Sequence, residues 1–190
     1  MLRDPNIGNF NRVEIIFDQP SQEIQRQIRD LFHRRKKHDL LLLYFFGYGV
    51  LGEAGHLFLA ASDTELDSLQ GTAIPAAHVT DSMDRSFSRQ QILILDCVHI
   101  AAFAPGARIE LGSSVGVGPA FEGKGYWRFV LAANDTTQVA WTGDALPGDA
   151  QQSGFTRYLI QGLGTGAADL DQDGRIEIIS YGCIQNELET

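Results

Sequence analysis

The apolar run of residues 40–46 (LLLLYFF) is the feature that most constrains what this chain can fold into. It has the length of a strand and no polar alternation, a pattern typical of a strand covered on both faces of a sheet. Residues 91–97 (QILILDC) form a second such run, which stays apolar until Asp96. The two runs predict central strands of a layered domain, and each leads into a polar side chain, Tyr48 or Asp96.

Strand and helix patterns alternate along the rest of the chain. The other predicted elements are strands over residues 13–17, 56–61 and 128–133 and helices that begin at Ser21, at Pro75 and at Ser153. This alternation predicts an α/β domain with a mostly parallel sheet. In such sheets functional side chains gather at the carboxyl ends of the strands, where we expect both Tyr48 and Asp96.

The composition argues against several classes of protein. With 190 residues, 44% of them hydrophobic and 21% charged, the chain is long enough for one globular domain with its own core. The net charge of −9 argues against a general nucleic-acid binder. Residues 34–38 (RRKKH) form the one basic cluster, which we interpret as a solvated helix end, with a partner surface as the alternative.

The sequence also lacks the signals of a membrane or secreted protein. No apolar run approaches the roughly 18 residues that a membrane-spanning helix needs, and the opening stretch MLRDPNIGNF has no apolar signal-peptide region. The two cysteines, Cys97 and Cys183, are far apart and lack metal-ligand spacing. This usage is typical of a reducing compartment, so we expect a cytoplasmic protein without membrane attachment.

Two blocks around the strand ends are distinctive: DLLLLYFFGYGVLGEAGHLFLAASDT and SRQQILILDCVHIAAFAPGA. The first resembles the segment of caspase-like and metacaspase-like peptidases in which a strand ends in Ser-Gly-His-Gly. The second is similar to their Asp-Cys-Cys-x-Ser-Gly or Asp-Ser-Cys-His-Ser-Gly segment. Three flanking blocks resemble those of bacterial members: RDPNIGNFNRVEIIFDQPS, VLAANDTTQVAWTG and SGFTRYLIQGLGTGAADLDQDGRI. The resemblance covers nearly the whole chain, in family order.

The resemblance implies a three-layer caspase-like fold over residues 1–190, with a mostly parallel central sheet flanked by helices. It begins after the family's first strand and helix, so it also implies a sheet without the usual first strand. That strand is central in the family and contributes to the specificity pocket. Its loss would leave neighbouring strand edges open, to be filled by upstream sequence or by a partner, or else would weaken the fold.

The resemblance also places the family's catalytic dyad in this sequence, at Tyr48 and Val98. In the family a histidine acts as general base at the first position and a cysteine as nucleophile at the second. Valine has no nucleophilic atom, and tyrosine, with an ordinary pKa near 10, is a poor base at neutral pH. Ile100 and Ala101 replace the Ser-Gly that helps form the family's oxyanion hole, and Phe46 replaces the serine before Gly-His.

Two further residues near the dyad positions carry alternative interpretations. Asp96 is retained from the family, where it helps hold a basic substrate side chain; it is either a cation-binding carboxylate or a strand-end residue bonded to local backbone. Cys97 is the alternative nucleophile, with His99 two residues further on the same strand face. Because this face is opposite to that of Val98, we interpret Cys97 as a core residue rather than as part of a relocated dyad.

An aspartate-rich stretch, DLDQDGRI from Asp169, matches the first eight positions of a calcium loop, with Asp169, Asp171 and Asp173 as ligands. The twelfth position, which should be a bidentate glutamate, is Ser180. We therefore expect no tight calcium site and no other cofactor. The weaker alternative is that the loop binds calcium and the chain is a calcium-dependent interaction module. The chain is predicted to be an inactive caspase-like module that binds a protein or peptide, or a degenerate gene product. The alternative is an active endopeptidase that cleaves after Arg or Lys through Cys97.

Overall fold

The computed structural model describes residues 1–52, 55–100, 128–133 and 154–165 of the chain. They belong to two compact units. One, here called the sheet unit, spans Ile16–Asp144, and the second unit combines Met1–Ile15 with Ala145–Thr190. No helix in the described part of the chain is long and apolar enough to cross a membrane.

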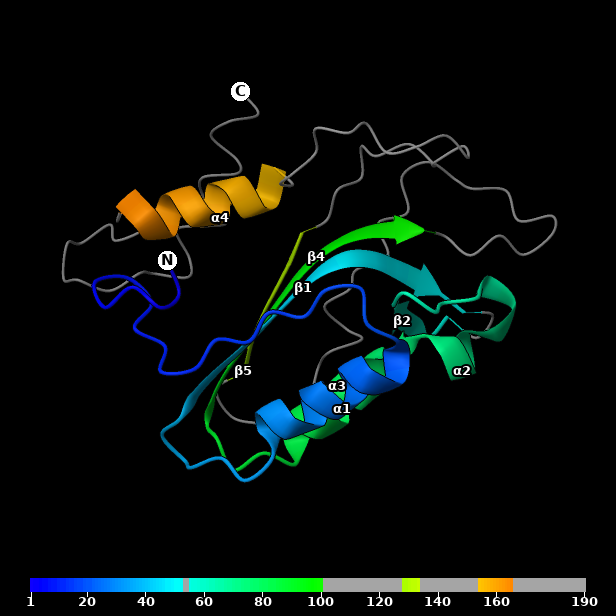
Figure 1. Cartoon of the computed structure of the whole chain (residues 1–190), viewed down its shortest axis with the longest axis horizontal. Helices are drawn as coiled ribbons and strands as arrows, with labels where there is room; N and C mark the ends of the chain where they lie inside the picture. Colours follow the sequence, from blue (N-terminus) through cyan, green and yellow to red (C-terminus); the bar gives the residue numbers. More distant parts are fainter. Residues whose placement is uncertain (53–54, 101–127, 134–153, 166–190) are drawn as a thin grey trace. The chain divides into compact units, whose positions relative to one another are not determined.

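The sheet unit is built around a five-stranded mixed sheet with the order β3-β2-β1-β4-β5 (Figure 1). β1 pairs in parallel with β4 and β4 in parallel with β5, whereas β1–β2 and β2–β3 are antiparallel. The α/β class is confirmed, but among the described strands only β1, β4 and β5 pair in parallel. The strands are β1 (Leu40–Leu51), β2 (Leu57–Leu59), β3 (Ile74–Pro75), β4 (Gln90–Ile100) and β5 (Arg128–Ala133).

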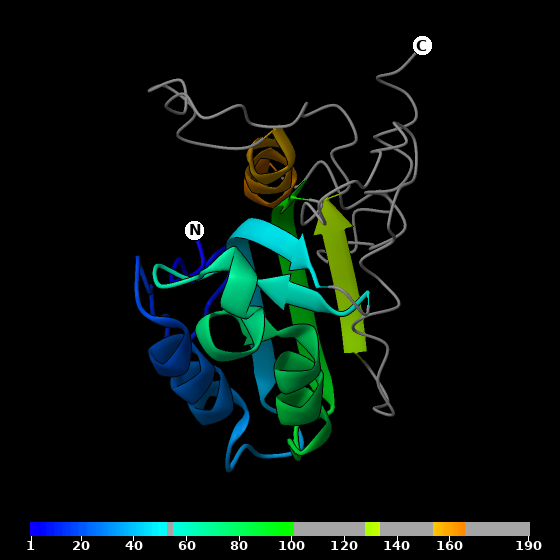
Figure 2. The same cartoon turned by 90° about the vertical axis from the view of Figure 1, so that its right-hand side faces the viewer.

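Helices α1 and α3 cover one face of this sheet (Figure 2). The helices of the unit are α1 (Ser21–Phe32), α2 (Leu69–Thr72) and α3 (Ala76–Asp84), with a 3-10 turn, η1, at Leu66–Ser68. α1 follows Pro20, and its last turn is closed by Arg35, whose Nε donates to the carbonyl of Leu31 at 2.6 Å. The basic cluster thus supplies a side chain that satisfies a carbonyl of the helix end, as the interpretation of that cluster requires.

The core lies between these two helices and the odd-numbered residues of the central strands. Alternate residues of a strand face opposite sides of a sheet, so Leu41 on β1 and Leu93 and Leu95 on β4 point to the same layer. They pack against Phe32 of α1 and Met83 of α3, and all five side chains are buried. The even-numbered residues belong to the other face, where the described residues of the sheet unit include no helix.

That other face is unevenly buried. Tyr44 and Phe46 of β1 are exposed, whereas Ile94 and Asp96 of β4, which pair with them in register, are buried. The prediction that the apolar run 40–46 is covered on both faces is therefore wrong for the even-numbered side of β1. The run is continuously apolar, yet half of its side chains reach the surface.

The strand predicted over residues 13–17 is also wrong. The segment is extended but pairs with no described strand, and Ile15 and Phe17 are exposed. Apolar and β-branched side chains favour a strand only where a neighbouring strand completes the hydrogen-bond ladder. Asp18, with φ of 46°, adopts the left-handed conformation and ends the extended segment before α1.

The remaining predicted elements agree with the structure to within a few residues, whereas η1, α2 and β3 were not predicted. The strand predicted over residues 56–61 is the shorter β2. Pro75 precedes α3 as its N-cap residue rather than standing in its first turn. In the second unit, the helix predicted from Ser153 is α4 (Gly154–Thr165).

Candidate functional site

The carboxyl ends of β1 and β4 lie side by side, and the two dyad positions meet there. In the parallel ladder Tyr48 is the register partner of Val98, and Phe46 is the partner of Asp96. Partner residues on adjacent parallel strands stand at the same level of the sheet. We expected the carboxyl-terminal parts of both strands to lie at the same end of the sheet. The register confirms this for the backbone of these positions.

Local sequence explains how Tyr48 is held at this edge. β1 continues past it and turns back into β2, so that the carbonyl of Tyr48 accepts a hydrogen bond from the backbone N–H of Ala60 at 2.9 Å. Gly47 precedes it because the ring of Phe45 occupies the adjacent space: a Cβ on Gly47 would lie 3.0 Å from that ring. Tyr48 itself is half-buried, and its phenol is a poor general base for activating a nucleophile.

Asp96 is buried, with 6% of its surface exposed, and has a side-chain partner that the sequence interpretation missed. The hydroxyl of Tyr44 donates to Oδ2 of Asp96 at 3.2 Å. Both interpretations of Asp96 are compatible with this contact, because a carboxylate can accept several hydrogen bonds. The contact follows from the register of the ladder: Tyr44 pairs with Ile94, two residues before Asp96, so Tyr44 and Asp96 share a face. The sequence alone does not give this register.

Cys97 points into the core, as its strand register predicts. It is 3% exposed and belongs to the cluster formed with Leu93 and Leu95. Burial, and secondarily the negative charge of Asp96, raise the pKa of its thiol to about 12. At pH 7 the nucleophilic thiolate would then be on the order of one molecule in 10⁵. The alternative hypothesis, an active site at Cys97, would require a partly exposed thiol with a lowered pKa.

The buried thiol predicts a specific alkaline instability. The pKa of Cys97 rises from an ordinary value of 9.0 in the unfolded chain to about 12 in the folded one. Because the unfolded state releases its proton first, the stabilising contribution is complete below pH 9 and is lost as the pH rises toward 12, by up to about 1.4 kcal/mol per pH unit. Urea unfolding at pH 8, 9 and 10 measures this slope.

The control for that measurement is Cys97→Ala, which has no thiol to ionise. Its free energy of unfolding should fall less steeply between pH 9 and pH 10 than that of the natural chain. Equal slopes for the two proteins would show that Cys97 ionises as readily in the folded state as in the unfolded one.

The candidate calcium ligands Asp169, Asp171 and Asp173 lie outside the described residues. Within the described ranges, no group of three or more His, Cys, Asp or Glu side chains is arranged to hold a metal ion.

Calcium therefore gives a separate prediction, which rests on Ser180 at the twelfth position of the loop. Because a bidentate glutamate supplies much of the affinity in such loops, we expect millimolar calcium to leave the melting temperature unchanged. Thermal denaturation with calcium, and with magnesium as the control, checks this. A shift of several degrees that is lost in Asp171→Ala would contradict it.

No protein-family model matches the chain. No curated protein matches it either.

Proposed function

We propose that the chain is a caspase-like domain without peptidase chemistry, which acts as a binding or regulatory module for a protein or peptide in the cytoplasm. The observation that carries the proposal is the register of Tyr48 with Val98. A cysteine–histidine dyad needs its two side chains at adjacent points of one edge. The chain brings two residues to such points, and neither is able to attack a carbonyl or accept a proton from a nucleophile.

The finer fold is part of the same proposal: a three-layer caspase-like domain. Its support is the parallel arrangement β1-β4-β5, with helices α1 and α3 packed on one face. A degenerate gene product would share these features but would bind no partner.

The alternative, an endopeptidase that uses Cys97, is the weaker candidate. A nucleophilic cysteine needs partial exposure and a neighbour that lowers its pKa. Cys97 is enclosed by leucine side chains and lies next to a carboxylate, both of which raise the pKa of its thiol. A conformational change large enough to expose it would have to open the core between β4 and the two helices.

The proposal is tested by hydrolysis of fluorogenic peptides that contain Arg or Lys, with and without calcium. It predicts no release of fluorophore above the rate in buffer. Turnover that disappears in Cys97→Ala would overturn it in favour of the alternative.

A further inference from the structure

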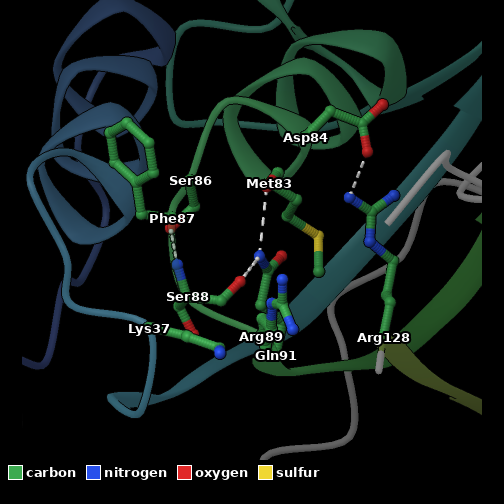
Figure 3. A pocket seen from close by; sticks show the side chains of 9 residues that line it. All are labelled: Lys37, Met83, Asp84, Ser86, Phe87, Ser88, Arg89, Gln91 and Arg128. Atoms are coloured by element: carbon green, nitrogen blue, oxygen red, sulfur yellow. Dashed lines mark hydrogen bonds and ion pairs between the residues drawn. The ribbon is translucent and has the colours of Figure 1, made fainter. Parts of the chain in front are cut away.

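A second site lies at the other end of the strands, where β4 and β5 begin. Here the structure describes an open hollow of about 510 Å³ within the sheet unit (Figure 3). Its floor contains Gln91 and Arg128, which are register partners in the parallel ladder. Its wall includes Asp84 at the end of α3, and the loops before β1 and β4 contribute Lys37 and Arg89.

Arg128 is the most unusual side chain of this hollow, because it is buried while only part of its guanidinium is satisfied. Its side chain is 6% exposed, and Nη2 donates to Oδ1 of Asp84 at 2.5 Å. Nε and Nη1 are buried and have no hydrogen-bond partner among the described residues. Unsatisfied donors on a buried charge are costly, so an oxygen acceptor that reaches this corner would gain two charge-assisted hydrogen bonds.

Gln91 adds an acceptor whose orientation is fixed. Its Nε2 donates to the carbonyl of Ser88 at 2.9 Å and to that of Met83 at 3.1 Å. Since both partners are carbonyl oxygens, the amide nitrogen has to face them, and Oε1 has to point away. Oε1 is buried and has no partner in the described structure. The corner therefore offers two donors from Arg128 and one acceptor from Gln91.

The charge around the hollow has the opposite sign to that of the chain as a whole. The described residues that line the hollow include three cations and one carboxylate: Lys37, Arg89, Arg128 and Asp84. The full sequence, in contrast, carries a net charge of −9. The two exposed cations are held close together, because the backbone N–H of Arg89 donates to the carbonyl of Lys37 at 3.1 Å. A local excess of positive charge in an acidic protein favours a small anion at this place.

We propose that this hollow binds inorganic phosphate in its hydrogen phosphate form. The proposal does not depend on the function inferred for the Tyr48 edge. Hydrogen phosphate has oxygens that accept from Nε and Nη1 of Arg128, and it keeps one O–H that donates to Oε1 of Gln91. Because Nε and Nη1 of Arg128 are buried, binding requires the guanidinium to turn toward the hollow. Sulfate and carboxylates lack the O–H and leave Gln91 unsatisfied.

The first test compares anions on the natural full-length chain by isothermal titration calorimetry at pH 8. Phosphate and sulfate are then both dianions, and they differ in the single O–H group. We expect phosphate to bind about tenfold or more tightly than sulfate, since the buried oxygen of Gln91 gains a partner only from phosphate. Phenyl phosphate, a dianion without an O–H at this pH, should bind as weakly as sulfate. Equal affinities for the three anions, or no binding of 10 mM phosphate, would overturn the proposal.

The second test changes the protein. Arg128→Gln should reduce phosphate affinity by about 10- to 100-fold, because it removes the charged donors from the floor. If this variant is unfolded, Lys37→Ala serves instead: Lys37 is exposed, and its loss should weaken binding about threefold with an unchanged melting temperature. The matched control is Arg12→Gln, which makes the same charge change at an exposed residue outside the hollow. Equal affinities of Lys37→Ala and Arg12→Gln would show that phosphate binds elsewhere.

Discussion

The natural chain is expected to hydrolyse no Arg- or Lys-containing fluorogenic peptide, with or without millimolar calcium. In a nucleophilic hydrolase the nucleophile and its base act as a unit, and removal of either one costs roughly 10⁶ in kcat. In the proposed caspase-like domain, Val98 and Tyr48 stand at the positions of both. A loss of this size puts the rate below detection in an end-point assay with micromolar protein, and overnight incubation with mass spectrometry of the peptide extends the range.

A positive control comes from restoring the two groups, in the double variant Tyr48→His, Val98→Cys. Because residues 48 and 98 are register partners, the introduced imidazole and thiol should stand at the same level of the edge. A neighbouring imidazolium lowers the pKa of a thiol, so the double variant should react with iodoacetamide faster at pH 6 than Val98→Cys alone. Full turnover is not expected, since in the proposed caspase-like domain Ile100 and Ala101 stand at the positions of the oxyanion turn.

Two outcomes would contradict this prediction in different ways. Turnover by the natural chain that is abolished in Cys97→Ala would place a working nucleophile in the core of the sheet unit. Equal iodoacetamide reactivity of the double variant and of Val98→Cys would mean that the side chains at positions 48 and 98 do not meet. The register would then give no support to a former dyad.

The sequence predicted the elements that depend on local patterning and on the rules of α/β sheets. The runs 40–46 and 91–97 are apolar for a full strand length, so their assignment as strands needed no knowledge of tertiary contacts. The α/β class also followed, because strands that alternate with helices favour a layered domain with parallel strands. The position of Cys97 in the core followed from alternation along β4, and the structure confirms it.

The missed features depend on partners that are distant in the sequence. Residues 13–17 have the composition of a strand, but strand formation also needs an edge to pair with, and sequence composition does not report whether one is free. The contact between Tyr44 and Asp96 joins residues 52 apart, and the meeting of Gln91 with Arg128 requires the register of β4 with β5. Exposure of Phe46 was likewise hidden, because a continuous apolar run does not reveal which face is covered.

The core of the sheet unit predicts a large loss of stability in Leu95→Ala. Leu95 is fully buried on the central part of β4, among the side chains that join the sheet to α1 and α3. Truncation leaves a cavity that surrounding elements fill only in part, so the free energy of unfolding should fall by about 2–5 kcal/mol. Urea denaturation followed by circular dichroism measures the difference, and far-ultraviolet spectra without denaturant establish that the variant is folded.

Phe46→Ala is the matched control, because it removes a larger side chain from the opposite face of the same sheet. Phe46 is 57% exposed, so its truncation should cost less than about 1 kcal/mol, although an alanine in place of a buried phenylalanine costs about 3–5 kcal/mol. The ratio of the two losses in unfolding free energy thus compares the burial of the two faces of the sheet. A loss at Phe46 as large as at Leu95 would contradict the exposed even-numbered face of β1.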